Sequence, residues 1–186
     1  MKIGKEVLEV GSNLFEMIEF AVTPPKSVES PLTGEQQIIK PSTFGVNVAK
    51  VREVIRLPQI VPCMTKCPEV MGVFNLRGLP VPVINLAMAL GQPSEPITPS
   101  SQVIVTEFAK RIAGFVVSET RRIRRVSWDK VLPPSSEAFN SITGMMLIEN
   151  NDFLFIIDFE RILVEIEGKA APQQAPSRGS DRGSSD

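Results

Sequence analysis

The stretch VMGVFNLRGLPVPVINL, residues 70–86, decides the fold class of the chain. Two apolar, valine-rich runs, 70–76 and 81–86, flank the short connector Arg77-Gly78-Leu79-Pro80. Branched aliphatic side chains favour pleated strands, whereas glycine and proline mark turns. The stretch therefore predicts two strands joined by a turn, with Arg77 projecting where the first strand ends.

Short strand-like runs continue on both sides of this hairpin. They cover residues 17–22, 44–51, 102–108, 112–117, 123–128, 145–149 and 153–157. Helical signals are few: residues 86–90 before Gly91, and a last helix, 159–167, that Asp158 would cap and Gly168 would end. About nine strands separated by turn signals predict barrels or sandwiches, and the proline-rich link 92–101 could divide two small barrels.

Two polar segments interrupt or follow this pattern. Residues 23–43 hold four prolines and few large apolar side chains, which predicts a long excursion between two strands. Residues 168–186 consist mostly of Gly, Ala, Pro, Gln and Ser, and such a composition cannot offset its own ordering entropy. We therefore expect one domain over residues 1–167 and a disordered tail, or a linker, over 168–186.

Composition excludes several functional classes. The 186 residues include no histidine, which excludes Ser-His-Asp and Cys-His nucleophiles and histidine-bound metals. With Lys plus Arg at 20 and Asp plus Glu at 21, the net charge is −1, which is unsuited to general binding of nucleic acid or anionic membranes. Nucleotide-binding glycine motifs, an apolar run of membrane-spanning length and a signal-peptide core are not found in the sequence. We expect a cytoplasmic protein without cofactor or metal, although a carboxylate enzyme remains an alternative.

Arginine is the residue type with the clearest functional candidates. Arg77 is either a solvated hairpin charge or an interface anchor, because arginine is enriched at the centres of protein interfaces. The run Arg121, Arg122, Arg124 and Arg125 is interpreted as a solvated strand edge, with an acidic protein partner and a nucleic-acid patch as alternatives. Strand alternation would send Arg122 and Arg124 to the same face.

Several other polar residues are candidates for a functional or a structural role. Asp158 after an apolar strand is a helix cap, although a response-regulator phosphoacceptor presents the same local pattern. Cys63 and Cys67, spaced C-x3-C, are plain small side chains near a strand end, a reactive thiol or an incidental bridge. Glu53, with arginines nearby, is an ordinary surface charge when considered alone.

Residues 44–55 and 70–86 together resemble the CheW family of bacterial chemotaxis coupling proteins. The run from Gly72 to Leu86 is similar to the family pattern G-[VI]-x-N-L-R-G-x-x-x-P-[VI]-[VI]-x-L, and the likeness extends over about residues 14–166. The opening stretch, residues 7–20, looks like the coupling half of CheV proteins, which normally carry a receiver domain after this half.

This resemblance implies a mainly β fold of two intertwined, five-stranded, SH3-like barrels with a hydrophobic groove between them and a short C-terminal helix. It implies a non-enzymatic adaptor between the regulatory domain of a CheA-type histidine kinase and the cytoplasmic tips of methyl-accepting chemoreceptors. No cofactor, metal, nucleic acid or direct membrane insertion belongs to that role. The alternative is a truncated CheV-type, phosphorylation-regulated module that has lost its receiver domain.

The resemblance also assigns roles to single residues. Arg77 falls on the arginine of the N-L-R-G signature, which is associated with coupling, and Gly72 on its first glycine, where close backbone packing is expected. Val51 and Glu53 fall on the K-V-x-E segment, associated with kinase and receptor contact. Asn75 could fix the strand end beside Arg77 by a side-chain hydrogen bond.

Three features depart from the family pattern. Asn85 stands where the family usually has Asp, and Ser118 where many members have Asp after a strand. Segment 23–43 is longer than the usual first hairpin loop, so it could cover one end of the first barrel or hinder a standard contact.

Overall fold

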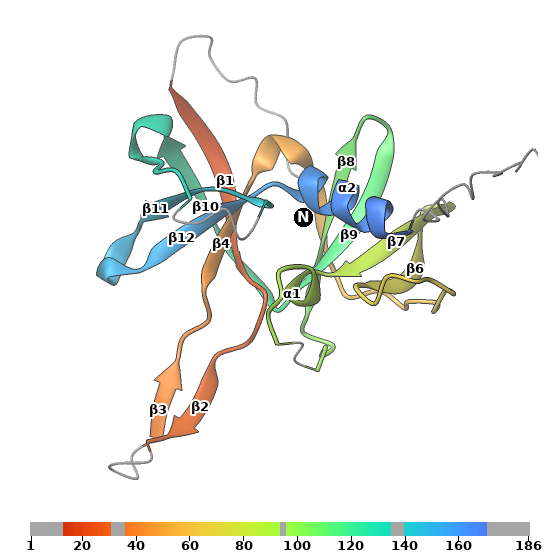
Figure 1. Cartoon of the computed structure of the whole chain (residues 1–186), viewed down its shortest axis with the longest axis horizontal. Helices are drawn as coiled ribbons and strands as arrows, with labels where there is room; N and C mark the ends of the chain where they lie inside the picture. The colour runs from red at the N-terminus through yellow and green to blue at the C-terminus, as the bar shows by residue number, and fades with distance from the viewer. Residues whose placement is uncertain (1–12, 31–35, 94–95, 135–139, 171–186) are drawn as a thin grey trace, which may run out of the picture.

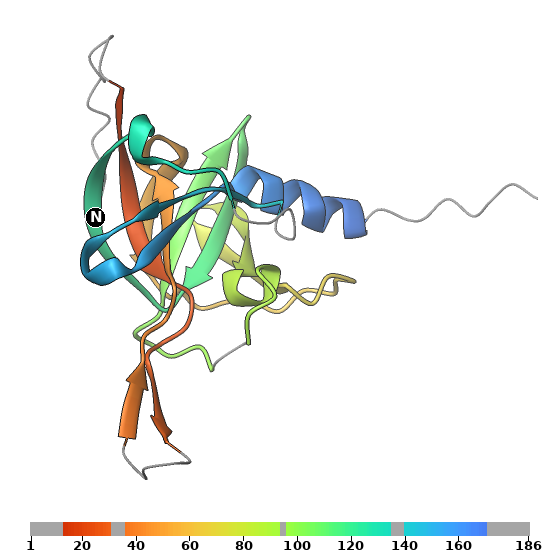
Figure 2. The same cartoon turned by 60° about the vertical axis from the view of Figure 1, so that its left-hand side comes forward.

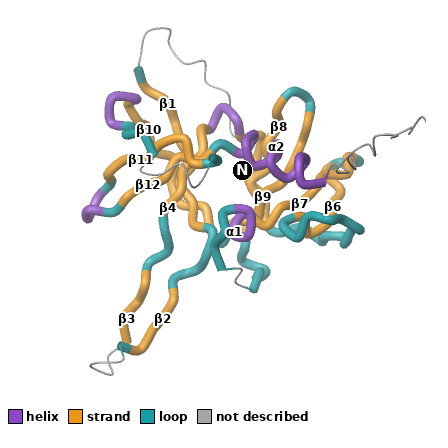
Figure 3. The backbone as a smooth tube through the Cα atoms, in the orientation of Figure 1, coloured by secondary structure: helices purple, strands orange, loops and turns teal. Residues whose placement is uncertain are grey.

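The computed structural model describes residues 13–30, 36–93, 96–134 and 140–170, which fold into strands with little helix (Figures 1 and 3). One five-stranded sheet has the order β10-β1-β4-β12-β11 and a second has the order β5-β8-β9-β7-β6. The strands of the first sheet are β1 Leu14–Ala21, β4 Thr43–Asn47, β10 Glu119–Ser127, β11 Ile142–Leu147 and β12 Phe153–Ile157. Those of the second are β5 Val51–Arg56, β6 Val70–Leu76, β7 Leu79–Asn85, β8 Gln102–Phe108 and β9 Arg111–Val117.

The remaining elements are short. A separate two-stranded sheet pairs β2 Lys26–Glu29 with β3 Gln36–Ile39. The helices are α1 Leu86–Ala89, α2 Phe159–Ala170 and the 3-10 turns η1 Val48–Lys50, η2 Trp128–Lys130 and η3 Glu149–Asn151. Asn85 caps α1, because its side-chain oxygen accepts a hydrogen bond from the Met88 amide at 3.2 Å, so a polar cap survives at this departure from the family pattern.

The two large sheets are intertwined in chain order. The first sheet takes strands from both ends of the described chain, whereas the second is built from its middle. The sheets also curl: an isolated bridge joins Leu132, beyond edge strand β10, to Met145 on the opposite edge strand β11. A matching bridge joins Val61, beyond edge strand β5, to Val73 on β6. The predicted fold class is thus confirmed, with single bridges rather than continuous ladders between the edges.

A shared apolar core lies between the two sheets and α2. Helix α2 buries Phe159, Ile162, Leu163 and Ile166, which repeat at intervals of three and four and so form one helix face. Phe159 stacks on Phe115 of the second sheet with ring centroids 4.2 Å apart. Side chains of both sheets, α1 and α2 fill this region, and the hydrophobic groove expected between the barrels stays a prediction.

Strand β1 is buried on both of its faces. Phe15 and Met17 belong to a smaller core within the first sheet, whereas Ile18 and Phe20 belong to the shared core. Because successive side chains of a strand point to opposite faces, a strand between two cores must be apolar on both. This explains why β1 reads as a nearly continuous apolar run.

The single strand predicted over residues 44–51 is wrong. Strand β4 ends at Asn47, whose side-chain oxygen accepts a hydrogen bond from the Ala49 amide at 2.9 Å and starts turn η1. Strand β5 then begins at Val51 in the other sheet. The apolar alternation continues through Val48 and concealed the point where the chain crosses between the sheets.

Two further expectations need correction. Segment 23–43 contains the β2–β3 hairpin, which projects away from both sheets instead of covering an end of the first one (Figure 2). Helix α2 does not end at Gly168 but runs to Ala170, and Lys169 pairs with Glu69 at 2.6 Å to hold its last turn. Residues 171–186 of the predicted tail lie outside the described residues, so the domain boundary stays a prediction.

Gly72→Ala tests the close packing at β6. Gly72 has φ +148°, a value that favours glycine, and an added Cβ would overlap the carbonyl oxygen of Val61 in the bridge that curls the second sheet. We expect a loss of more than about 1 kcal/mol in the free energy of unfolding, measured by urea denaturation. Gly168→Ala is the control, because its Cβ meets open space, and it should be neutral or stabilising. Equal stability of the wild type and the Gly72 variant would contradict this account.

Candidate protein-binding site

The turn between β6 and β7 holds Arg77 in a defined position. Arg77 and Gly78 have φ values of 53° and 89°, as a two-residue hairpin turn with positive φ at both positions requires. The Asn75 side-chain oxygen accepts a hydrogen bond from the Gly78 amide at 2.6 Å, which confirms the predicted strand-end contact. Because β7 begins at Leu79, the connector is two residues long rather than the four predicted.

Arg77 forms an ion pair with Glu53. The Arg77 Nη2 atom lies 3.1 Å from Glu53 Oε2, and the side chains are 59% and 9% exposed. Glu53 is on edge strand β5 and Arg77 follows edge strand β6, so the pair connects the two edges of the second sheet. The two residues predicted separately to face partners therefore touch each other, and the Arg77 side chain is the exposed member of the pair.

The other predicted site residues have different environments. Gly72 is buried, and its contact with Val61 confirms the expected close backbone packing. Val51 is buried in the shared core, so its side chain stabilises the fold, and a role in partner contact stays a prediction. Asn75 is exposed and acts through its turn hydrogen bond.

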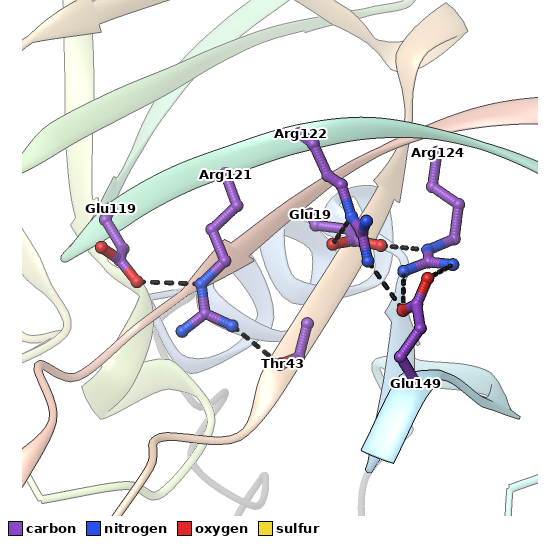
Figure 4. Close-up of polar contacts among 7 residues, drawn as sticks. All are labelled: Glu19, Thr43, Glu119, Arg121, Arg122, Arg124 and Glu149. Carbon is purple, nitrogen blue, oxygen red and sulfur yellow. Dashed lines mark hydrogen bonds and ion pairs between the residues drawn. The ribbon is translucent and has the colours of Figure 1, made fainter. Parts of the chain in front are cut away.

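The arginine run lies on edge strand β10 and three of its members are exposed, as predicted, but its guanidinium groups also form a network of ion pairs (Figure 4). Arg122 and Arg124 point to the same side, as alternation predicted, and both bind the buried carboxylate of Glu19 on β1. Arg124 also lies 2.6 Å from Glu149, in the turn after β11. The prediction of a solvated charge is wrong for Arg124, whose side chain is only 17% exposed.

The remaining two arginines of the run are paired as well. Arg121 donates to Glu119 at 2.8 Å and to the Thr43 hydroxyl at 3.0 Å, and Arg125 pairs with Glu16 at 3.0 Å (Figure 4 shows the Arg121 contacts). Every guanidinium of the run thus bonds to a carboxylate of the same chain. This neutralisation removes the basis for a nucleic-acid patch, which needs uncompensated cationic charge.

Glu19 is the buried carboxylate of this network, and the sequence analysis missed it together with Glu149. Glu19 stands in a strand, LFEMIEFA, whose other described side chains near it are apolar and buried. A carboxylate in such a strand needs cationic partners, because an unpaired buried charge is strongly destabilising. The four arginines of one later strand were the available signal.

The polar residues with alternative interpretations take structural roles. Asp158 accepts a hydrogen bond from the Glu160 amide at 3.0 Å and pairs with Lys50 at 3.0 Å, which confirms the helix cap. Buried Cys67 donates its thiol hydrogen to the Ile166 carbonyl at 3.4 Å, while Cys63 is exposed, and both are free thiols.

The described part of the chain contains neither a metal-ligand cluster nor a membrane-spanning helix. Residues 13–30, 36–93, 96–134 and 140–170 contain no group of three potential metal ligands among Cys, Asp and Glu. None of their helices has the length and apolar character needed to cross a bilayer.

The comparisons with known proteins decide the family. The model of the CheW-like domain matches residues 34–167. The chain belongs to the CheW-like domain family. Relatives that match it are named as chemotaxis proteins CheW and CheV, and the chain is a non-enzymatic member of the family.

Individual relatives agree with this assignment. The chain is 42% identical over 130 residues to chemotaxis protein CheV3 of Helicobacter pylori, a match of 67% of this chain but only 42% of CheV3. It is 30% identical over 156 residues to the probable chemotaxis protein CheW of Rhizobium etli, covering 78% of this chain and 98% of that protein. The crystal structure of scaffolding protein TtCheW from Thermoanaerobacter tengcongensis has the same fold, with a TM-score of 0.65 at 19% identity over 84% of this chain and 97% of TtCheW.

Glu149→Gln tests the arginine network by its pH dependence. The hydrogen bond from Arg124 lowers the pKa of Glu149 from 4.5 to about 2. Since the folded-state pKa is depressed, the Glu149 carboxylate stabilises the fold above pH 4.5, and this contribution is lost as the pH falls from 4.5 toward about 2. The variant should therefore unfold at a lower urea concentration than the wild type at pH 7, with the difference shrinking below pH 4.5.

The control for this titration is Glu167→Gln, which removes another exposed carboxylate that pairs with an arginine, Arg111, at 2.6 Å. It leaves Arg124 and Glu19 untouched. A difference between Glu149→Gln and wild type that stayed constant from neutral to acid pH would contradict the assignment.

Proposed function

We propose that the chain couples a CheA-type histidine kinase to methyl-accepting chemoreceptors, as a non-enzymatic adaptor. The observation that carries this proposal is the CheW-like match over residues 34–167, which contains the Asn75–Gly78 turn. The relatives named as chemotaxis proteins support the same role. We place the protein in the cytoplasm, with the kinase regulatory domain and the cytoplasmic receptor tips as partners.

Arg77 is the proposed centre of the kinase contact. Its guanidinium is exposed, while the turn and Glu53 hold it in place, so little conformational freedom is left to lose on binding. Leu79, directly after the turn, is 48% exposed and adds apolar surface beside the charge. An apolar patch with one oriented arginine is the usual composition of an interface centre.

Glu53 acts through Arg77 in this proposal. Its side chain is almost fully buried, so a partner reaches the guanidinium before it reaches the carboxylate. Removing Arg77 leaves a buried carboxylate without its cationic partner, and removing Glu53 leaves the guanidinium less oriented. Both changes should weaken binding, through different causes.

A contact made by one arginine and one neighbouring apolar side chain gives each copy of the adaptor a modest affinity for its partner. In an array, each adaptor touches more than one neighbour, and linked contacts raise the effective concentration of every single contact. Reversible coupling between kinase and receptors therefore requires no covalent chemistry.

Arg77→Ala should weaken binding of the kinase regulatory domain by at least about tenfold, since deletion of an interface-centre arginine commonly costs more than 1.4 kcal/mol. The measurement is titration calorimetry with the regulatory domain of a CheA-type kinase from the same genome. Arg111→Ala is the matched control: Arg111 also pairs with a glutamate, Glu167, and its side chain is 58% exposed, close to the 59% of Arg77.

Further measurements distinguish the loss of a binding residue from the loss of the fold. Glu53→Ala should also weaken binding, while circular dichroism and urea denaturation show that all variants remain folded. Unchanged affinity of the kinase domain for both the Arg77 and the Glu53 variant would contradict the assignment of this site. Equal losses in the Arg77 and Arg111 variants would indicate a general charge effect instead.

A CheV-type module is the second candidate. The 42% identity to CheV3, over a match that spans 42% of that protein, favours it. In this case a receiver domain would follow the coupling domain, and its phosphorylation would regulate coupling. Sequencing the gene beyond the codon for Asp186 tests this candidate. A receiver domain encoded in frame would support the CheV-type module, and a stop codon would support the stand-alone adaptor.

A further inference from the structure

The β2–β3 hairpin has no core of its own to hold it. Its two strands pair with each other in a separate sheet, and both five-stranded sheets lie away from it (Figures 1 and 2). Val28, Ile38 and Ile39 are 42%, 72% and 56% exposed. A two-stranded ribbon with both faces in water is marginally stable, and a third or fourth strand is what such a ribbon normally requires.

The two open edges of the hairpin differ in charge. Strand β2 begins with Lys26 and ends with Glu29, so charged side chains flank its edge. Strand β3 has the sequence QQII, without any charge and with two β-branched residues. Natural proteins protect edge strands with charges, prolines or bulges, and β3 has none of these within Gln36–Ile39. The β3 edge is therefore the one suited to pair with another strand.

We propose that β3 pairs antiparallel with β3 of a second copy of this chain, which makes the hairpin a self-association arm. A two-fold axis at Ile38 gives a four-stranded sheet in the order β2-β3-β3-β2 and places the two Ile38 side chains next to each other. Gln36 then lies opposite Lys40 of the other copy, so no like charges face each other. An edge that pairs with its own copy satisfies the self-complementarity that two-fold symmetry demands.

The geometry of the arm leaves room for this pairing. Because the hairpin projects away from the sheets, two copies can join at the arms with their sheets on opposite sides of the contact (Figure 2). With the axis at Ile38 the ladder covers residues 36–40 of each copy, which is a small interface, so the dimer is weak and forms at high concentration. Such a contact becomes effective where many copies are already held close together.

Sedimentation equilibrium of the full chain, from micromolar to millimolar concentration, tests the arm. The weight-average mass of the wild type should rise from 20.4 kDa toward twice that value. Ile38→Lys and Ile38→Glu should each weaken the dimer at least about tenfold, because like charges then meet at the axis. An equimolar mixture of the two variants should restore dimers, since opposite charges then face each other. Val28→Lys is the control. It introduces a charge on β2, away from the axis, and should leave the affinity of the dimer unchanged.

Three results would overturn the proposal. One is a wild type that stays at 20.4 kDa over the whole range. Another is a dimer that survives both Ile38 variants. The third is a dimer that Val28→Lys weakens as much as the Ile38 variants do, or that the mixture of the two Ile38 variants does not restore. Either result would show that the dimer does not form by pairing of β3 about Ile38. A monomeric wild type whose kinase or receptor binding falls with Ile38→Lys would assign the arm to those partners instead.

Discussion

The shared apolar core between the two sheets is the constraint on which the other features depend. Phe20, Phe115 and Phe159, from one sheet, the other sheet and α2, are fully buried there. Neither sheet can bury this face alone, so removing one would expose aromatic surface that contributes about 1.5–3 kcal/mol per large side chain. The core also requires β1 to be apolar on both faces and requires α2 to return across the sheets. The positions of the exposed edges follow from this arrangement.

The two large sheets connect their edges in the same way, and a difference in exposure between them is consistent with the proposed site. In each sheet an isolated bridge and arginine–glutamate contacts connect the two edges: Arg122 and Arg124 bind Glu149 in the first sheet, and Arg77 binds Glu53 in the second. In the first sheet, Arg124 is enclosed and shares the buried Glu19 with Arg122. In the second, the carboxylate is the buried member and the arginine remains accessible. Arg122 of the first sheet is 57% exposed, but its charge is shared between two carboxylates, Glu19 and Glu149, whereas Arg77 pairs with Glu53.

The sequence predicted what depended on local pattern. Alternation in β10, the turn at Arg77-Gly78, the cap at Asp158 and the strand-end role of Asn75 all follow from short-range geometry, and the structure has each of them. It did not reveal contacts that depend on topology. Glu53 and Arg77 are 24 residues apart, and Glu19 and Arg122 are 103 apart, so only the sheet order brings them together.

Two errors of the sequence analysis have one physical cause. The strand break at Asn47 and the hairpin in segment 23–43 are both decided by where the backbone pairs, not by which side chains are buried. Apolar alternation continued across Asn47 although the chain changed sheets, and Ile38 lies in a strand although it is exposed. Hydrophobic pattern reports burial, so it predicts a strand only where pairing and burial coincide.

The two proposed contact regions differ in how much order each must acquire on binding. Arg77 is held by a two-residue turn, the Asn75 hydrogen bond and a buried carboxylate, and all of these exist before a partner arrives. The β2–β3 arm gains a third and a fourth strand only when it pairs, so part of its interaction energy must offset its own ordering. The Arg77 contact is therefore suited to set which partner binds and in what orientation. The arm is suited to respond to crowding, because its pairing becomes favourable only when other contacts have already raised the local concentration of the chain.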